Sequence, residues 1–337
     1  TGGTWADSLN PNYEIVLNGQ LNLKGDSVGI YAGEGTRVLN NTSGQITVGA
    51  HSLGIYSKDL VTASVGFNKG TILIAGIESA GLRADGISTM ENTGTIESQQ
   101  DILGNYYTNV QGIIATNGAT VDNSGIITLN GAKSVGIYTN NGTINMTGGS
   151  IGVNADQSVG IYSKGSLSNT FITGGTIEAK TLDGGSAVAL YAEDSVINIS
   201  NGATIKASDG GILFYTSFTG TTPTGTFNLA SGTVEAEIGA NGTGFYQKGD
   251  SSDLGIQTFL NTIFTGTGNL NVTLTDQSAR LFIIESTGGV TNLSSLVPGS
   301  LSMLSGTKVS VDPSSVTGFG AFLINKGELN IDQNVDL

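Results

Sequence analysis

The sequence predicts an all-β protein, a right-handed parallel β-helix with three short strands in each coil and about ten to twelve coils. Three observations predict this fold. Apolar residues recur in three tracks, in the same order, at steps of about 25 residues. Each track is a short run of alternating apolar and polar residues, as strands require. Gly, Asn, Asp or Ser bounds each run and indicates a turn.

The composition agrees with many short strands and tight turns. The chain has 337 residues, 52 Gly, no Cys and only 12% charged residues. Gly, Ser, Thr and Asn are abundant and are poor helix formers, but they suit turns and sheet edges. The absence of Cys excludes a disulfide scaffold and a thiolate metal site.

The charge restricts the partners that the chain can have. The net charge is −14, and the three Arg residues are scattered along the sequence. Nucleic acid and anionic lipid attract clusters of Lys and Arg, so neither is an expected partner. The longest apolar runs are too short to span a bilayer, and the first residues lack a signal-peptide pattern. We therefore expect no membrane contact by this segment itself.

The clearest track carries the motif Ser-Val-Gly-Ile-Tyr, at Ser27–Tyr31, Ser134–Tyr138 and Ser158–Tyr162. Its Gly is interpreted as a corner residue rather than as part of a phosphate site. Its Tyr points away from the Ile by strand alternation, and forms either a stacking ladder that stabilises the sheet or a platform for sugar rings. The predicted apolar anchors of this track are Ile30, Ile55, Leu82, Ile113, Ile137, Ile161, Leu190, Leu213, Phe245 and Leu281.

A second track carries Asn-x-Gly-Thr-Ile, as at Asn68–Ile72 and Asn92–Ile96. Asn tolerates the left-handed backbone of a tight corner, and stacked Asn amides can also bond from coil to coil. We expect one of these structural roles for the Asn residues before the strands, Asn41, Asn68, Asn92 and Asn123. The predicted anchors are Leu21, Ile46, Ile72, Ile96, Ile126, Ile151, Ile177, Ile205 and Val234, followed by Leu270, Val309 and Leu329.

A fainter third track lies between the other two. Its strands, like those of the other two tracks, are short runs of alternating apolar and polar residues. The predicted anchors are Val38, Val65, Met90, Val121, Ile144, Phe171, Ile197 and Phe227.

The repeat divides the chain into three parts. Residues 1–13 are a lead-in or cap, residues 14–215 form regular coils, and residues 216–337 continue the β-helix with longer loops and looser repeats. Four insertions fall between strands, at 98–110, 216–226, 247–257 and 285–300. Because loops on a rigid scaffold commonly carry binding, the candidate partner-binding residues are Tyr106, Tyr107, Phe218, Asp250 and Asp253.

No catalytic, cofactor-binding or metal-binding residues are predicted. His51 is the only His and has no evident partner in the sequence, so it is interpreted as a surface residue of a coil. A polysaccharide hydrolase would need two or three carboxylates within about 5–10 Å, and Asp183 could meet Asp156 or Asp209 from neighbouring coils. A lyase would need basic residues, which are sparse. We therefore expect a protein that is not an enzyme, with a polysaccharide hydrolase or lyase as the alternative.

Together, the two motifs resemble the passenger repeats of large fusobacterial autotransporter adhesins. The resemblance is close over about residues 14–215 and looser beyond, where 325–330 repeat the Asn-x-Gly pattern. It implies a β-helical rod on the bacterial surface or outside the cell, anchored in the outer membrane by a translocator barrel outside this chain. It also implies adhesion to a host-cell or bacterial surface protein or glycan. A purely structural stalk segment is a further alternative.

Overall fold

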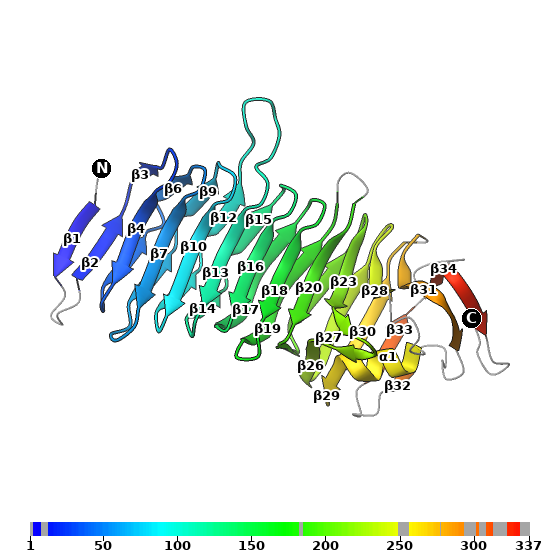
Figure 1. Cartoon of the computed structure of the whole chain (residues 1–337). Coiled ribbons are helices and arrows are strands. Elements are labelled where there is room, and N and C mark those ends of the chain that lie inside the picture. The colour runs from blue at the N-terminus through cyan, green and yellow to red at the C-terminus, as the bar shows by residue number, and fades with distance from the viewer. Residues whose placement is uncertain are drawn as a thin grey trace.

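The structure is a computed structural model, and it is an all-β solenoid of parallel sheets (Figure 1). It describes residues 3–7, 13–181, 185–248, 256–276, 278–292, 301–302, 308–312 and 322–330. Within them the strands stack in three columns, and each strand pairs in parallel with the equivalent strands of the neighbouring coils. The prediction of an all-β parallel solenoid from repeated short strands is therefore confirmed.

The first column begins each coil. Its strands are β2 (Tyr13–Leu17), β5 (Arg37–Asn40), β8 (Val65–Asn68), β11 (Thr89–Asn92), β14 (Thr120–Asn123), β17 (Thr143–Val153), β19 (Asn169–Ala179), β21 (Val196–Ser200), β26 (Thr226–Ser231) and β29 (Phe264–Gly266).

The second column shares β17 and β19 with the first, because these two strands bend and run through both columns. Its other strands are β3 (Gln20–Asn22), β6 (Gln45–Val48), β9 (Thr71–Ile74), β12 (Thr95–Ser98), β15 (Ile126–Leu129), β22 (Ala203–Ala207), β27 (Thr233–Ile238), β30 (Asn269–Leu274) and β33 (Lys308–Asp312).

The third column is a separate sheet, with eleven strands among the described residues. They are β4 (Val28–Gly33), β7 (Leu53–Asp59), β10 (Ala80–Gly86), β13 (Gln111–Thr116), β16 (Val135–Asn140), β18 (Val159–Lys164), β20 (Ala187–Glu193), β23 (Gly211–Thr216), β28 (Thr243–Lys248), β31 (Arg280–Asn292) and β34 (Phe322–Asn330).

A few elements depart from the parallel columns. β1 (Gly3–Asp7) pairs antiparallel with β2, so the backbone groups on that edge of β2 are bonded. β24 (Phe218–Thr219) and β25 (Thr222–Pro223) form a small hairpin, and β32 (Leu301–Ser302) pairs antiparallel with β33. Helix α1 (Ile256–Ile263) is the one helix in the described part of the chain.

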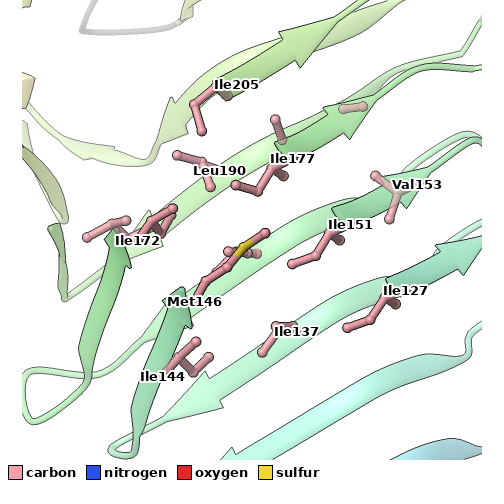
Figure 2. Packing of buried hydrophobic residues seen from close by; sticks show 14 of the residues in the cluster. Ile127, Ile137, Ile144, Met146, Ile151, Val153, Ile172, Ile177, Leu190 and Ile205 are labelled. Atoms are coloured by element: carbon pink, nitrogen blue, oxygen red, sulfur yellow. The ribbon is translucent and has the colours of Figure 1, made fainter. Parts of the chain in front are cut away.

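The core consists of inward side chains that stack directly above one another. Ile30, Ile55, Leu82 and Ile113 are partners in successive strands of the third column, and all are buried. Figure 2 shows the same stacking farther along, where Ile127, Ile151, Ile177 and Ile205 follow one another in the second column. Burial of each such side chain contributes about 1.5–3 kcal/mol.

Several predicted anchors are one residue away from the position that stacks in register with the neighbouring coils. Ile127, not Ile126, lies between Ile96 and Ile151, and Ile126 faces solvent at 47% exposure. The other corrected positions are Gly66 for Val65 and Thr170 for Phe171. Phe214 and Phe282 are in register with the third-column anchors, and the predicted Leu213 and Leu281 beside them are buried as well. Gly66 occupies its place because the long side chain of Met90 fills the space above it: a Cβ there would lie 2.4 Å from Met90 Sδ.

The Gly of the Ser-Val-Gly-Ile-Tyr motif is not a corner residue. In the variant of this motif at Ser52–Tyr56, where Leu replaces Val, Gly54 lies inside β7 and is buried, and a Cβ on it would approach the backbone oxygen of Gly81 to 2.5 Å. Close contact between adjacent strands therefore requires Gly at this position.

The Asn residues before the second-column strands form an internal ladder. Each side-chain amide donates to the next, from Asn40 to Asn68 (2.8 Å), from Asn68 to Asn92 (2.7 Å) and from Asn92 to Asn123 (2.7 Å). All four are buried, so the coil-to-coil role is confirmed. The first member is Asn40 rather than Asn41, and none of the four has a left-handed backbone.

Candidate functional site

The longest insertion is a projecting arm, residues 99–109, between β12 and β13 (Figure 1). Its tip is an ordered turn, because the Asp101 carboxylate accepts hydrogen bonds from the backbone N–H groups of Leu103 (2.8 Å) and Asn105 (2.9 Å). These bonds lower the pKa of Asp101, and the bond from Asn105 has the largest effect. The turn presents Ile102 and Leu103 to solvent, at 102% and 79% exposure.

The predicted binding residues of the arm lie at its base. Tyr106 forms an antiparallel bridge with Gln100, and Tyr107 packs against the hydrophobic core. The exposed apical residues are instead Ile102 and Leu103. The sequence pattern Asp-x-x-Gly, which is typical of a type I turn, could have placed them at the tip.

The second predicted loop, at 216–226, contains the β24–β25 hairpin. The ring of Phe218 stacks on that of Phe259 in α1, with centroids 5.7 Å apart. Phe218 also packs against the core, so it holds the hairpin and the helix together. Asp250 and Asp253 lie outside the described residues.

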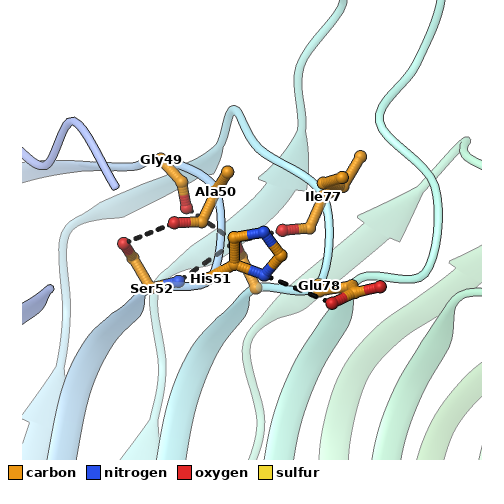
Figure 3. Close-up of polar contacts among 7 residues, drawn as sticks. Gly49, Ala50, His51, Ser52, Ile77 and Glu78 are labelled. Carbon is orange, nitrogen blue, oxygen red and sulfur yellow. Dashed lines mark hydrogen bonds and ion pairs between the residues drawn. The ribbon is translucent and has the colours of Figure 1, made fainter. Parts of the chain in front are cut away.

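His51 lies at a corner between the second and third columns, beside Glu78 at the same corner of the next coil (Figure 3). Both have left-handed backbones, with φ of 53° and 55°. The Nδ1 of His51 is 3.2 Å from a carboxylate oxygen of Glu78, and both side chains are about half exposed. The pair joins two corners, and a surface pair of this kind contributes at most about 1 kcal/mol.

The Tyr residues of the repeat form a tyrosine ladder, Tyr138, Tyr162, Tyr191, Tyr215 and Tyr246, on the outer face of the third column. The rings of Tyr162 and Tyr191 are parallel within 1°, with centroids 4.5 Å apart. They therefore cover one another's faces and turn their edges outward. This geometry agrees with a stabilising ladder over this part of the column.

A polar network borders the ladder. Tyr162 donates a hydrogen bond to Glu193, and the Lys164 ammonium lies 3.0 Å from the same carboxylate. Burial raises the pKa of Tyr162, and the bond to Glu193 raises it further. Burial also raises the pKa of Glu193, but the bonds from Tyr162 and Lys164 outweigh it, so that this pKa lies below its usual value.

A groove of about 850 Å³ lies at the far end of the ladder. It lies where the corners before β23, β28 and β31 meet the outer face of the third column. Polar side chains and two tyrosines share its lining, which includes Asp209, Tyr215, Asn241, Thr243, Tyr246 and Arg280.

The residues that line the groove come from equivalent positions of successive coils. In a solenoid such positions lie one strand spacing, about 4.8 Å, apart. Asp209 and Asn241 occupy the same corner of successive coils, both with left-handed backbones. Thr243 and Arg280 are partners at the starts of β28 and β31, and Tyr215 and Tyr246 follow in register. The arrangement can offer stacking surfaces together with hydrogen-bond donors and acceptors. Sequence reasoning missed this groove, although Tyr215 and Tyr246 extend the Tyr track.

Other kinds of site have little support in the described residues. Among them no group of three or more His, Asp or Glu could hold a metal ion. In the same ranges no helix combines the length and the apolarity that crossing a bilayer requires. Of the carboxylates predicted to meet from neighbouring coils, Asp183 lies outside the described residues, and Asp209 is the one carboxylate in the groove lining. Asp156 accepts a hydrogen bond (2.8 Å) from the backbone N–H of Ser186, which also lines the groove.

Comparisons with known proteins found no match among protein-family models, curated proteins or solved structures.

Proposed function

We propose that this chain is part of the secreted passenger of a bacterial autotransporter adhesin. It forms a right-handed β-helix of ten to twelve coils, displayed on the cell surface and anchored by an outer-membrane barrel outside this chain. It binds a host-cell or bacterial surface protein or glycan through its arm or one outer face. Right-handed winding is supported by the general rule for crossovers between parallel strands, and eleven third-column strands among the described residues support the coil number.

The observation that carries the adhesive role is the ordered, apolar tip of the arm. Ile102 and Leu103 occupy the two central positions of a turn whose flanking Asp101 and Gly104 are bonded to each other. Holding two large aliphatic side chains in water is unfavourable, and contact with another molecule would remove this cost. Exposed apolar groups at a projecting tip are typical of interaction sites.

The test uses the whole chain on beads, with cultured host cells and with a panel of bacteria. Saturable adhesion is expected, and the double variant Ile102→Ser with Leu103→Ser should weaken it about tenfold. Leu167→Ser is the matched control, because Leu167 is also exposed, at 72%, but lies in a short corner away from the arm. Adhesion of the wild-type chain to neither cells nor bacteria would contradict the proposal.

The groove favours one alternative, an enzyme that acts on a polysaccharide. A hydrolase of the usual kind needs two carboxylates, and Asp209 is the one found in the described lining. Release of reducing ends from neutral or acidic polysaccharides, with loss of activity in Asp209→Asn, would establish the enzyme instead of the adhesin. Normal adhesion of the arm variant would favour a structural stalk or another binding face.

A further inference from the structure

The groove differs from the rest of the tyrosine ladder in how its rings are spaced. Tyr162 and Tyr191 lie 4.5 Å apart and parallel, whereas the centroids of Tyr215 and Tyr246 are 6.5 Å apart, with 35° between the ring planes. The ladder therefore loosens where it enters the groove. Both rings are half-buried and line the groove, so they present aromatic surface to whatever occupies it.

The polar part of the lining offers hydrogen bonds of both kinds. Asp209 accepts, the Arg280 guanidinium donates, and the Asn241 amide does both. These groups come from successive coils and therefore repeat along the rod at the strand spacing, about 4.8 Å. A ligand that matches them is an extended chain of similar units lying parallel to the rod axis.

The surroundings exclude two other extended ligands. An added peptide strand would need free backbone groups at a sheet edge, but the floor of the groove is the face of a sheet whose strands are paired on both sides. A nucleic acid would need clustered cations, whereas Arg280 is the one cation in the described lining and the chain carries a net charge of −14. A carbohydrate chain has both the apolar ring faces and the hydroxyl groups that this lining matches.

The charges indicate which carbohydrate fits. Asp209 and Arg280 give the described lining no net formal charge. The negative potential of the whole chain disfavours an anionic polysaccharide. We propose that the groove binds a neutral, extended oligosaccharide, whose sugar rings pack on Tyr215 and Tyr246 and whose hydroxyls bond to Asp209, Asn241 and Arg280.

This inference rests on the proposed function, because a surface-displayed rod meets glycans on the cell that it contacts. The test measures binding of the whole chain to two sets of soluble glycans. The neutral set contains oligomers of N-acetylglucosamine, galactose and mannose, and the anionic set contains hyaluronan and chondroitin sulfate. We expect titration calorimetry to detect binding of at least one neutral oligomer. The affinity should increase with the length of the oligomer over the first few sugar units.

Three variants and one control locate the site. Tyr246→Ala should weaken binding about tenfold, and Asp209→Asn and Arg280→Gln should each weaken it severalfold. Asn retains the left-handed backbone of position 209, so the Asp209 variant tests the site even if Tyr246→Ala unfolds. Tyr31→Ala is the control, because Tyr31 lies on the same face, 53% exposed, many coils from the groove. It should bind as the wild type does.

The outcomes separate this inference from the proposed function. If the chain adheres to cells but the groove variants bind glycans as well as the wild type does, the groove is not the glycan site, and the proposal of an adhesin is unaffected. Absence of binding to every neutral oligomer, or preference for the anionic set, would also overturn the inference. If the chain does not adhere to cells but binds a neutral oligomer through the groove, the glycan site is supported and the proposal of an adhesin is rejected.

Discussion

Residues 14–215 and residues 216–292 form the same three columns but fill them differently. In the first region aliphatic side chains stack on aliphatic ones, and successive third-column anchors from Ile137 to Phe214 are 24, 29 and 24 residues apart, by subtraction. Beyond Phe214 the anchors are Phe245 and Phe282, at steps of 31 and 37 residues. The rings of Phe214, Phe227, Phe245, Phe264 and Phe282 form one buried cluster.

The difference shows how a solenoid accommodates larger side chains. Helix α1 and the β24–β25 hairpin both fall in the region of longer steps, and Phe259 of the helix packs on Phe218 and Phe282. The added chain therefore supplies a wall for the bulkier core. Where the inward residues keep one size, most coils need only short turns. The coil that carries the arm is the exception, because its step from Leu82 to Ile113 is 31 residues, by subtraction.

The largest expected effect comes from removing a ring of the phenylalanine cluster. Phe245→Ala should lower the free energy of unfolding by about 3–5 kcal/mol, because a cavity remains among the rings of Phe214, Phe264 and Phe282. Urea unfolding followed by far-ultraviolet circular dichroism measures the loss. Phe171→Ala is the control, since Phe171 lies on the outer face at 40% exposure, and it should cost below about 1 kcal/mol. Equal losses of stability in the two variants would show that the buried phenylalanine cluster is no more important than an exposed ring.

The next effect belongs to the regular region and its buried amides. Asn92→Ala removes the middle of the ladder and leaves an amide N–H of Asn68 and the carbonyl of Asn123 without partners. A loss of about 2–4 kcal/mol is expected in the same unfolding measurement. Asn145→Ala, which removes only a half-buried bond to Asp122, should cost about 1 kcal/mol or less. A loss no larger than that of the control would show that the ladder does not stabilise the coils.

A smaller effect tests the close approach of strands. Gly54→Ala places a Cβ 2.5 Å from the Gly81 oxygen, so adjacent coils must shift, at a cost of about 1–3 kcal/mol. Gly19→Ala is matched to it, because a Cβ there meets nothing within 4 Å. Hydrogen exchange of the β7 and β10 amides should speed up in the first variant only. Unchanged exchange in β7 would indicate that the coils adapt without strain.

The smallest effect is the dependence on pH from Glu193. Its folded-state pKa is lower than the ordinary value of 4.5, so its stabilisation is present above that value and is lost as pH falls through the folded-state pKa. The free energy of unfolding of the wild type should therefore exceed that of Glu193→Gln by about 0.5–1 kcal/mol at neutral pH, and the difference should shrink as pH falls below the ordinary value of 4.5. Unfolding curves at several pH values measure it. A difference that persists in acid would assign the effect to packing.

The sequence predicted the architecture because the period was visible without any structure. Three tracks in constant order identified the parallel solenoid, and the Asn track predicted either corner residues or coil-to-coil amides, of which the structure shows the amides. The arm was found as an insertion and Tyr106 and Tyr107 were named as its candidate binding residues, whereas Ile102 and Leu103 are the exposed side chains at its tip. Aromatic residues were favoured as contacts, whereas the bonds of Asp101 decide which side chains stand at the apex.

What the sequence determined by itself was the period, the three apolar tracks and the turn residues between them, since these depend on local alternation and on residue type. Only the tertiary structure decided which of two adjacent apolar residues faces inward, as at Ile126 and Ile127, and where the tyrosine ladder opens into a groove. The physical reason is that successive side chains of a strand point to opposite faces. When both are apolar, the inward one is chosen by its fit against the coils on either side.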